Sequence, residues 1–351
     1  MDNYFVRDKY MRFQYKKLLF CCLLLVCVVL GLVLLLNCSK LELENNRSYF
    51  SYNPFCIDNT GQAVILGVVH PGSEYAKPYY IRIPELRILT FDEINSVFEG
   101  GWIPSRNNLF LLIISEGKDN FFSLKTFQYD GEMLKEVKTI LFPNMFVTFP
   151  IWNPAGNIMA ARVNLIINGK VQEAKLGLSF DDGNNFDVTE WQFGIVVWEA
   201  SDEFWMNSGN KLLELSIKEG KAHLENEIAF SEDDHLSLIG VSGKEPVYSL
   251  GNKIYRGDTV LYSGSGNKEC FDAMVDDQLI LVWERDLKRI TLLDRSGTIM
   301  HTRLLDEGAK PAGFSSTSKK IFLYENRRVL SMYDYEMDGP IQRLVDINFF
   351  H

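Results

Sequence analysis

The sequence has 351 residues, with 36 Lys and Arg against 46 Asp and Glu and a formal net charge of −10. Residues 1–40 hold six of the basic and only two of the acidic residues, so the remainder carries a net charge of about −14. Such an acidic chain lacks the basic surface that nucleic-acid binding requires, which excludes nucleic acid as a partner. The length allows one large domain or two smaller ones.

The first predicted element is the apolar segment Leu18–Leu36, which contains no charged residue. At a rise of about 1.5 Å per residue, a helix of this length crosses the hydrocarbon core of a bilayer. Lys16 and Lys17 precede it directly, and by the positive-inside rule the N-terminus stays in the cytoplasm. We therefore expect a single-pass membrane protein with a cytoplasmic tail over 1–17, a signal-anchor over 18–37, a spacer over 38–48, and a periplasmic or extracellular domain over 49–351.

Two other interpretations of this segment stay open. Leu35-Leu36-Asn37-Cys38 resembles a bacterial lipobox, in which Cys38 would carry a lipid, although Asn37 departs from that pattern. A cleaved signal peptide has an apolar core of about 7–15 residues and small residues before the cleavage site. The apolar segment here is longer, and Leu36-Asn37 is a poor cleavage site.

Cysteine and histidine are sparse beyond the anchor. Cys56 and Cys270 are the cysteines of the predicted exported domain, and a disulfide between them is allowed in an oxidising compartment. The five His residues are scattered along the chain, and no Cys/His cluster has the spacing of metal ligands. We expect no metal site and no other cofactor.

From Tyr49 to the C-terminus, short runs of Val, Ile, Leu, Phe and Tyr alternate with Gly, Asn, Asp and Pro. This pattern is typical of an all-β barrel, sandwich or propeller. Internal repeats favour the propeller. The segment Trp102–Asn107 (WIPSRN) returns as Trp152–Asn157 (WNPAGN), and Glu203–Leu213 returns as Glu245–Tyr255.

The spacing of the repeats predicts the number of blades. Second strands are expected to start near Gln62, Leu109, Ile158, Glu203, Glu245, Gln278 and Lys320. The gaps of roughly 33–49 residues are the size of a four-stranded blade. We therefore predict a seven-bladed β-propeller, with six or eight blades as alternatives. A strand near Tyr49–Phe55 is expected to complete the last blade and close the ring.

One turn carries a specific motif. Ser179-Phe180-Asp181-Asp182-Gly183-Asn184-Asn185-Phe186 resembles the Asp-box, the Ser-x-Asp-x-Gly-x-x-aromatic turn of sialidases and other BNR-repeat propellers. Ser179 and Asp181 can bond backbone groups within the turn, Gly183 can supply a positive φ, and Phe186 can pack beneath it. The resemblance implies a structural turn between the third and fourth strands of a blade, away from any active site.

A second resemblance concerns catalysis. Tyr80-Ile81-Arg82-Ile83-Pro84 is similar to the Arg-Ile-Pro motif near the start of sialidases, which implies that Arg82 binds a substrate carboxylate. Sialidases also need two further Arg, a Tyr–Glu pair and an acidic Asp, which the sequence does not place. The remaining candidates for the further Arg are Arg162, Arg256 and Arg285. The blade count puts Arg82 on a third strand, whereas a catalytic Arg would project from an innermost strand.

The remaining polar clusters fit turns. The acidic pairs Asp181-Asp182, Asp233-Asp234 and Asp276-Asp277 are better explained as turn residues than as calcium ligands. Ser263–Gly266 (SGSG) reads as a turn between blades. Two function hypotheses follow. The first is a non-catalytic, membrane-anchored propeller that binds a protein or carbohydrate partner; the second is a divergent sialidase-like exo-glycosidase.

Overall fold

The computed structural model describes residues 47–350, apart from 59, 92–93, 105–107, 115–119, 169, 232–234, 268–270 and 277. Tyr49–Val69 and Ser73–His351 form one compact unit, to which the features below belong. In the other unit the described residues are 47–48 and 70–72, where Ser48 Oγ lies 3.3 Å from His70 Nδ1. The predicted anchor Leu18–Leu36 and the lipobox Cys38 lie outside the described residues. Within the described part of the chain, no helix is both long and apolar enough to span a bilayer.

The compact unit is built almost entirely of β-strands. The strands of the first half are β1 (Tyr49–Ile57), β2 (Ala63–Val69), β3 (Ala76–Arg82), β4 (Arg87–Thr90), β5 (Val97–Ile103), β6 (Asn108–Ile114), β7 (Asn120–Tyr129), β8 (Leu134–Pro143), β9 (Met145–Trp152), β10 (Met159–Ile167), β11 (Lys170–Val171), β12 (Lys175–Ser179) and β13 (Asp187–Gln192). Those of the second half are β14 (Val196–Trp198), β15 (Glu203–Ser208), β16 (Lys211–Lys218), β17 (Lys221–Ala229), β18 (Leu236–Ser242), β19 (Glu245–Leu250), β20 (Lys253–Arg256), β21 (Thr259–Ser263), β22 (Phe271–Val275), β23 (Leu279–Glu284), β24 (Arg289–Asp294), β25 (Ile299–Leu304), β26 (Ala309–Ser315), β27 (Lys320–Glu325), β28 (Val329–Asp334) and β29 (Gln342–Asp346). A short 3-10 helix, η2 (Ile347–Phe350), follows β29.

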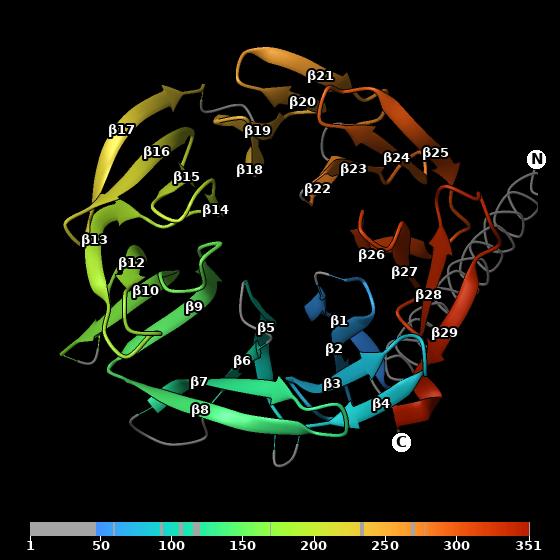
Figure 1. The fold of residues 1–351 in the computed structure, drawn as a ribbon, viewed down its shortest axis with the longest axis horizontal. Helices are drawn as coiled ribbons and strands as arrows, with labels where there is room; N and C mark the ends of the chain where they lie inside the picture. Colours follow the sequence, from blue (N-terminus) through green and yellow to red (C-terminus); the bar gives the residue numbers. More distant parts are fainter. Residues whose placement is uncertain are drawn as a thin grey trace, which may run out of the picture. The chain divides into compact units, whose positions relative to one another are not determined.

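The strands form six antiparallel sheets that are arranged in a ring (Figure 1). Four sheets have four strands each, one has the short β11 in addition, and one has eight. The eight-stranded sheet consists of the groups β1–β4 and β5–β8, which are joined through the single residue pair Ala76–Val97. In each group of four, called a blade below, the first strand lies nearest the ring axis and the last at the rim. The expectation of a β-propeller is confirmed.

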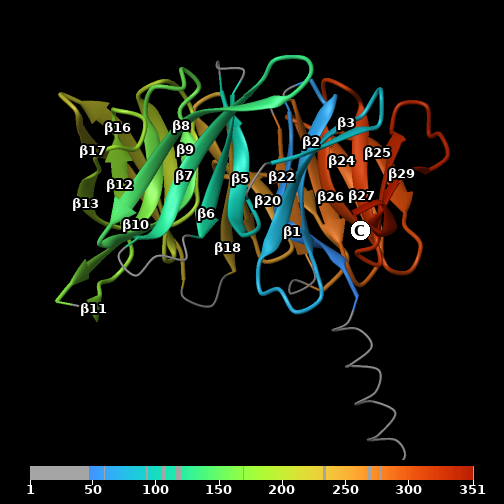
Figure 2. The same cartoon turned by 90° about the horizontal axis from the view of Figure 1, so that it is seen from below.

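The predicted positions of the second strands agree closely with the structure. Each of β2, β6, β10, β15, β19, β23 and β27 begins within one residue of its expected start. Strands run between two faces of the ring, as the side view shows (Figure 2). We call the face with the turns between first and second strands, and between third and fourth strands, face A; in the first blade these turns are residues 58–62 and 83–86.

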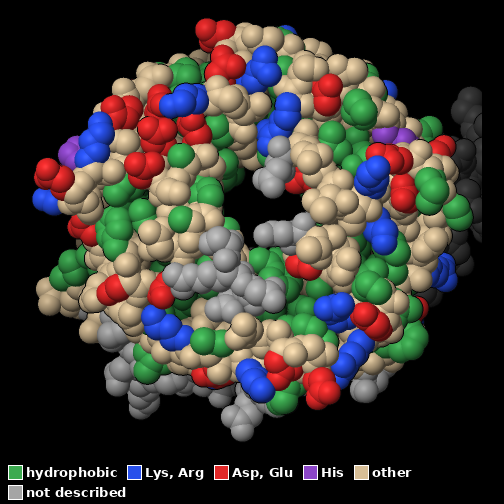
Figure 3. Space-filling model, viewed as in Figure 1, with side chains coloured by type: hydrophobic (Ala, Val, Ile, Leu, Met, Phe, Trp, Pro, Cys, Tyr) green, Lys and Arg blue, Asp and Glu red, His purple; other side chains and the backbone are tan. Residues whose placement is uncertain are grey.

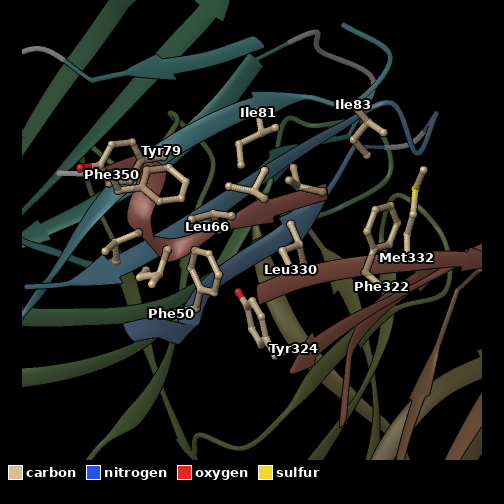
Figure 4. Packing of buried hydrophobic residues seen from close by; sticks show 14 residues of the cluster. Phe50, Leu66, Tyr79, Ile81, Ile83, Phe322, Tyr324, Leu330, Met332 and Phe350 are labelled. Carbon is tan, nitrogen blue, oxygen red and sulfur yellow. The ribbon is translucent and has the colours of Figure 1, made fainter. Parts of the chain in front are cut away.

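The core lies between neighbouring blades. All seven residues of β2 are buried, since a second strand is covered on both sides by the adjacent blades and therefore consists of a continuous apolar run. The cluster between the first and last blades includes Phe50, Leu66, Phe322 and Tyr324. Figure 4 shows Ile83, Phe322 and Met332 at one end of this cluster, and Tyr79 and Phe350 at the other.

The expected closure of the ring by strand 49–55 is wrong. β1 pairs with β2 inside the first blade, and β29 is the fourth strand of the last one. Packing between complete blades closes the ring instead, with the Phe50 and Tyr324 rings stacked at 5.4 Å. Two hydrogen bonds cross here: a main-chain bond from Phe50 N to Arg327 O at 2.8 Å, and a side-chain bond from Arg327 Nε to Phe50 O at 3.1 Å. We call this contact between β1–β4 and β26–β29 the seam.

Candidate functional site

A pocket of about 630 Å³ opens on face A at the seam. Sites for small ligands typically measure about 300–1,000 Å³. Its walls come from the turns of residues 58–62 and 83–86 in the first blade and from the turn 316–319 with β27–β29 in the last. The apolar lining residues are Ile83, Pro84, Leu86, Met332 and Leu344. Of these, Ile83, Met332 and Leu344 continue the core cluster of the seam to the surface. Because its walls come from the first and the last blade, this pocket exists only in the closed ring.

The charged residues lining the pocket are Lys320 and Arg343. Alternate residues of a strand point to the same side, so Lys320 shares the side of β27 on which Phe322 and Tyr324 face the first blade. Among the described residues Lys320 has no ion-pair partner. Arg343 is 76% exposed, and its Nη2 lies 3.8 Å from Glu325. The pocket is therefore locally basic on a chain whose net charge is −10.

A close contact across the seam forms the inner wall. Gly61 has a φ of +65°, and a Cβ added there would lie 2.0 Å from Ser318 Oγ. Only glycine fits this position, because both the left-handed backbone and the lack of space exclude a side chain. The Ser318 hydroxyl is buried and has no hydrogen-bond partner within the described residues. A buried hydroxyl normally has a partner, so Ser318 has an unmet hydrogen bond beside the pocket that it lines.

The structure does not bring the candidate Arg residues together. Arg82 ends β3, as the blade count expected, and its Nε lies 3.3 Å from Glu85. The Arg82 guanidinium also lies over the Tyr129 ring at 5.4 Å. The other three lie on three other blades: Arg162 is exposed on β10, Arg256 on β20 pairs with Glu245, and Arg285 pairs with Asp272. None of the four Arg residues belongs to an innermost strand.

The Asp-box residues form a tight turn between β12 and β13, the third and fourth strands of their blade. Ser179 Oγ accepts from Gly183 N at 2.8 Å and donates to Asp181 Oδ1 at 2.8 Å. Asp181 Oδ1 also accepts from Asn185 N at 2.9 Å. Gly183 has a φ of +92°, and the Phe186 ring lies 5.9 Å from that of Phe142 in the neighbouring blade. These contacts stabilise the turn and leave Asp181 no free oxygen pair for a ligand.

Other polar candidates also lie in turns or outside the described residues. Asp276 Oδ1 accepts from the backbone N of Gln278 and Leu279, and its Oδ2 accepts from Ser316 N at 2.6 Å. Asp233, Asp234, Asp277 and Cys270 lie outside the described residues, so the predicted disulfide stays a prediction. Its partner Cys56 is on β1, and burial raises the pKa of its thiol to about 12. Within the part of the chain that the structure describes, no His, Cys, Asp and Glu side chains gather as metal ligands.

Two carboxylates that the sequence did not single out are electrostatically unusual. Glu99, on the innermost strand β5, accepts one bond, from Phe149 N of β9 at 2.7 Å, and burial raises its pKa to about 7. Glu284 is 1% exposed. Burial alone would raise its pKa, but bonds from Arg289 Nε (2.8 Å), Tyr262 and the turn that contains SGSG hold the pKa below its usual value. The SGSG turn thus binds a buried carboxylate of the next blade.

Innermost strands surround an opening at the centre of the ring (Figure 3). Several of them carry a bulge, including β5 beside Glu99 and β26 beside Gly313. A bulge bends a strand and increases its twist, which suits strands that curve around a narrow axis. Glu99 thus lies on an innermost strand, where it bonds the next blade, and does not line the seam pocket.

The pocket residues Ser318, Lys320 and Gln342 were missed by the sequence reasoning. The run Ser315-Ser316-Thr317-Ser318-Lys319-Lys320 is polar, but such a run is ordinary for a surface turn. These side chains line a pocket only because the first blade lies across the seam from them. Its residues are more than 250 positions away in the sequence. Nothing in the sequence near these residues indicates that the first blade lies beside them.

No protein-family profile and no curated protein matches the sequence. Solved structures do resemble it. Prolyl oligopeptidase B from Galerina marginata, bound to a 35mer hydrolysis and macrocyclization substrate, matches with a TM-score of 0.59 at 10% identity, over 86% of this chain and 51% of that one. Its apo form gives 0.58, also at 10% identity, over 86% and 52%. The present chain spans about half the length of that enzyme.

The C-terminal WD40 domain of Sif2 matches with a TM-score of 0.52 at 14% identity, over 85% of this chain and 86% of that domain. At such low identities the likeness concerns the fold alone. The matches agree with the ring of sheets described above, and the fold of this chain is that of a β-propeller.

Proposed function

We propose that this protein is a non-catalytic binding module, a seven-bladed propeller that recognises a protein partner through the pocket on face A at the seam. The observation that carries the proposal is the pocket itself: an apolar floor joined to polar and basic side chains, at a place where two complete blades meet. Protein-recognition sites combine an apolar centre with a polar rim in this way. Propellers commonly serve as interaction modules, and the likeness to a WD40 domain supports this assignment.

The count of seven treats β1–β4 and β5–β8 as separate blades. One residue pair joins them, whereas full antiparallel ladders join the strands within each group. The spacing of the second strands supports the same count.

We also propose that residues 18–37 anchor the propeller in the membrane with the N-terminus in the cytoplasm, so that the ring lies in the periplasm or outside the cell. The apolar run Leu18–Leu36 and the preceding Lys16 and Lys17 support this topology. Attachment through a lipid on Cys38 is the alternative. Labelling the intact cell with a membrane-impermeant reagent would detect the propeller in either case, and mass spectrometry of Cys38 separates the two.

The binding proposal is tested with a peptide library displayed on phage and selected on the immobilised full-length chain. Gln342 is exposed on β29 and lines the pocket, so Gln342→Trp places an indole across the opening without disturbing the core. The matched control is Gln192→Trp, since Gln192 is also exposed on the last strand of a blade. We expect selected peptides to lose binding to the first variant only. Equal binding to both variants would refute the pocket as the recognition site.

A divergent sialidase-like exo-glycosidase with a carbohydrate partner is the second candidate. The Asp-box contacts of Ser179, Asp181 and Gly183 agree with the scaffold of such an enzyme and do not bear on its catalysis. Release of a fluorescent aglycone from a sialoside by the full-length chain tests it, with Arg82→Ala as the variant. We expect no release above the buffer rate. Release that is lost in Arg82→Ala would establish the glycosidase and refute the non-catalytic assignment.

A further inference from the structure

We propose that the seam pocket binds the C-terminus of its protein partner, with the terminal carboxylate at Lys320 and the apolar last side chain against Ile83, Met332 and Leu344. This inference rests on the proposed binding function and specifies the chemistry of the partner. It follows from three features of the pocket: its charge, an unsatisfied hydroxyl, and the position of the apolar wall.

The first feature is the positive charge of Lys320, which forms no ion pair among the described residues. Asp334 lies opposite Lys320 in the β27–β28 ladder, but its Oδ1 accepts from the backbone N of Glu336 and Met337. No Asp or Glu lines the pocket among the described residues. The adjoining turns of the first blade contain two acidic side chains, Glu85 and Asp58. Glu85 pairs with Arg82 at 3.3 Å, and both oxygens of Asp58 are engaged. Its Oδ1 accepts from Gln62 N at 2.7 Å and Ala63 N at 2.9 Å, and its Oδ2 accepts from Thr60 Oγ1 at 2.6 Å. Asp58 therefore stabilises its own turn, and the Lys320 ammonium can pair with an anion from a ligand.

The second feature is the Ser318 hydroxyl. Its oxygen is buried against Gly61 and has no partner within the described residues, although an unmade buried hydrogen bond costs about 1–3 kcal/mol. A carboxylate has two oxygens and accepts several hydrogen bonds. In the proposed complex one oxygen pairs with Lys320, at the start of β27, and the other accepts from Ser318 in the preceding turn. The Ser318 hydroxyl turns away from Gly61 to reach it.

The third feature distinguishes a chain terminus from an internal acidic residue. Ile83 and Met332 are buried, and Leu344 packs beside them, so the apolar wall adjoins the basic side chain within one pocket. In a terminal Val, Leu, Ile or Phe, the carboxylate and the apolar side chain branch from a single carbon. An internal Asp or Glu carries its charge at the tip of the side chain, with no apolar group beside it. The terminal residue therefore satisfies both parts of the lining.

The probes are four fluorescein-labelled hexapeptides that share the sequence Gly-Ser-Gly-Ser-Ala and end in Val, Leu, Ile or Phe. Each is used with a free C-terminus and as the C-terminal amide, and binding to the full-length chain in detergent is measured by fluorescence anisotropy. Two comparison ligands are a C-terminally amidated peptide with Glu at the last position and sialyllactose. We expect at least one free-acid peptide to bind, with its amide at least tenfold weaker.

Two variants locate the site. Lys320→Met should weaken binding of the free acid at least tenfold and leave the amide unchanged. Lys319→Met is the matched control, because it removes a charge one residue away whose ammonium already lies 2.6 Å from Glu336. Thermal unfolding of each variant shows whether it folds. If Lys320→Met does not fold, the comparison of acid with amide on the unmodified chain still tests the proposal.

The outcomes separate this inference from the function on which it rests. Equal affinity for acid and amide, equal binding to the Lys320→Met variant, or no binding by any peptide would overturn C-terminus recognition. Lys320-dependent binding of sialyllactose would overturn it in favour of a carbohydrate, and preference for the Glu peptide in favour of an internal acidic residue. If library peptides still bind in a manner sensitive to Gln342→Trp, the binding function stands even though the C-terminal chemistry has failed.

Discussion

Replacing Glu99 by Gln tests the electrostatics of the ring interior. Glu99 Oε2 accepts from Phe149 N at 2.7 Å, which links the innermost strands of two neighbouring blades. Burial raises the pKa of this carboxyl from its usual value near 4.5 to about 7, and the single bond from Phe149 only partly offsets that effect. Phe149 itself has a φ of +53°, so the backbone holds its N–H in an uncommon conformation opposite the carboxylate.

The sign of the pH dependence follows from the raised pKa. Between about pH 4.5 and pH 7 the folded chain holds a proton on Glu99 that the unfolded chain has lost, so the free energy of unfolding falls as the pH rises through this window. Each pKa unit corresponds to about 1.4 kcal/mol. Above pH 7 the ionised carboxylate therefore destabilises the fold by up to about 3 kcal/mol, relative to its protonated form.

Glu99→Gln removes the charge and keeps a carbonyl oxygen for Phe149 N. We expect the variant to be more stable than the unmodified chain by about 1–3 kcal/mol at pH 8, and to be nearly equal at pH 5. The measurement is urea unfolding of the full-length chain in detergent at both pH values, followed by fluorescence of its six Trp residues.

The matched control is Glu284→Gln. The Glu284 carboxylate is also buried, but Arg289, Tyr262 and two backbone N–H groups bond it, and its pKa lies below the usual value. The charge of Glu284 therefore stabilises the fold above the carboxyl's usual pKa, and this contribution is lost as the pH falls. Glu284→Gln removes this charge and should therefore destabilise the chain by about 3 kcal/mol at pH 8, an effect opposite in sign to that of Glu99→Gln. A destabilising Glu99→Gln at pH 8, or an effect equal at the two pH values, would refute the reasoning.

Three further substitutions test the structure by urea unfolding. Gly183→Ala should cost about 2 kcal/mol, mainly because a φ of +92° strains an alanine. Its Cβ would also displace the end of the Met159 side chain, whose Cε lies at 2.8 Å, so Gly131→Ala, with a φ of +103° and open space, should cost somewhat less. Asn153→Ala should cost about 2–4 kcal/mol, since the fully buried amide bonds Asn157, Ile158 and Ser201 O; an effect below 1 kcal/mol would contradict this. Phe350→Ala should cost about 3 kcal/mol, because its ring packs 4.5 Å from Tyr79 at the seam, whereas Phe349→Ala, at a 72% exposed residue, should change little.

Much of the local structure was evident in the sequence. Apolar runs of strand length and repeated turn residues predicted the second strand of every blade to within one residue, because a strand buried on both sides needs a continuous apolar run. The Asp-box segment predicted a turn whose bonds depend on residues two to four positions apart, such as Ser179 with Gly183. Interactions of such short range can be predicted from the order of residues alone.

The tertiary structure decided the features that join distant segments. Strand 49–55 was expected in the last blade, yet β1 pairs with β2. Phe50 reaches the last blade through side-chain packing and one main-chain bond to Arg327, which leave no periodic signal in the sequence. The pocket likewise needs Gly61 from one end of the chain against Ser318 from the other. The sequence by itself determined the strands, the turns and the acidic balance of the chain. Only the closed ring decided which of its turns face one another, since that depends on contacts between residues more than 250 positions apart.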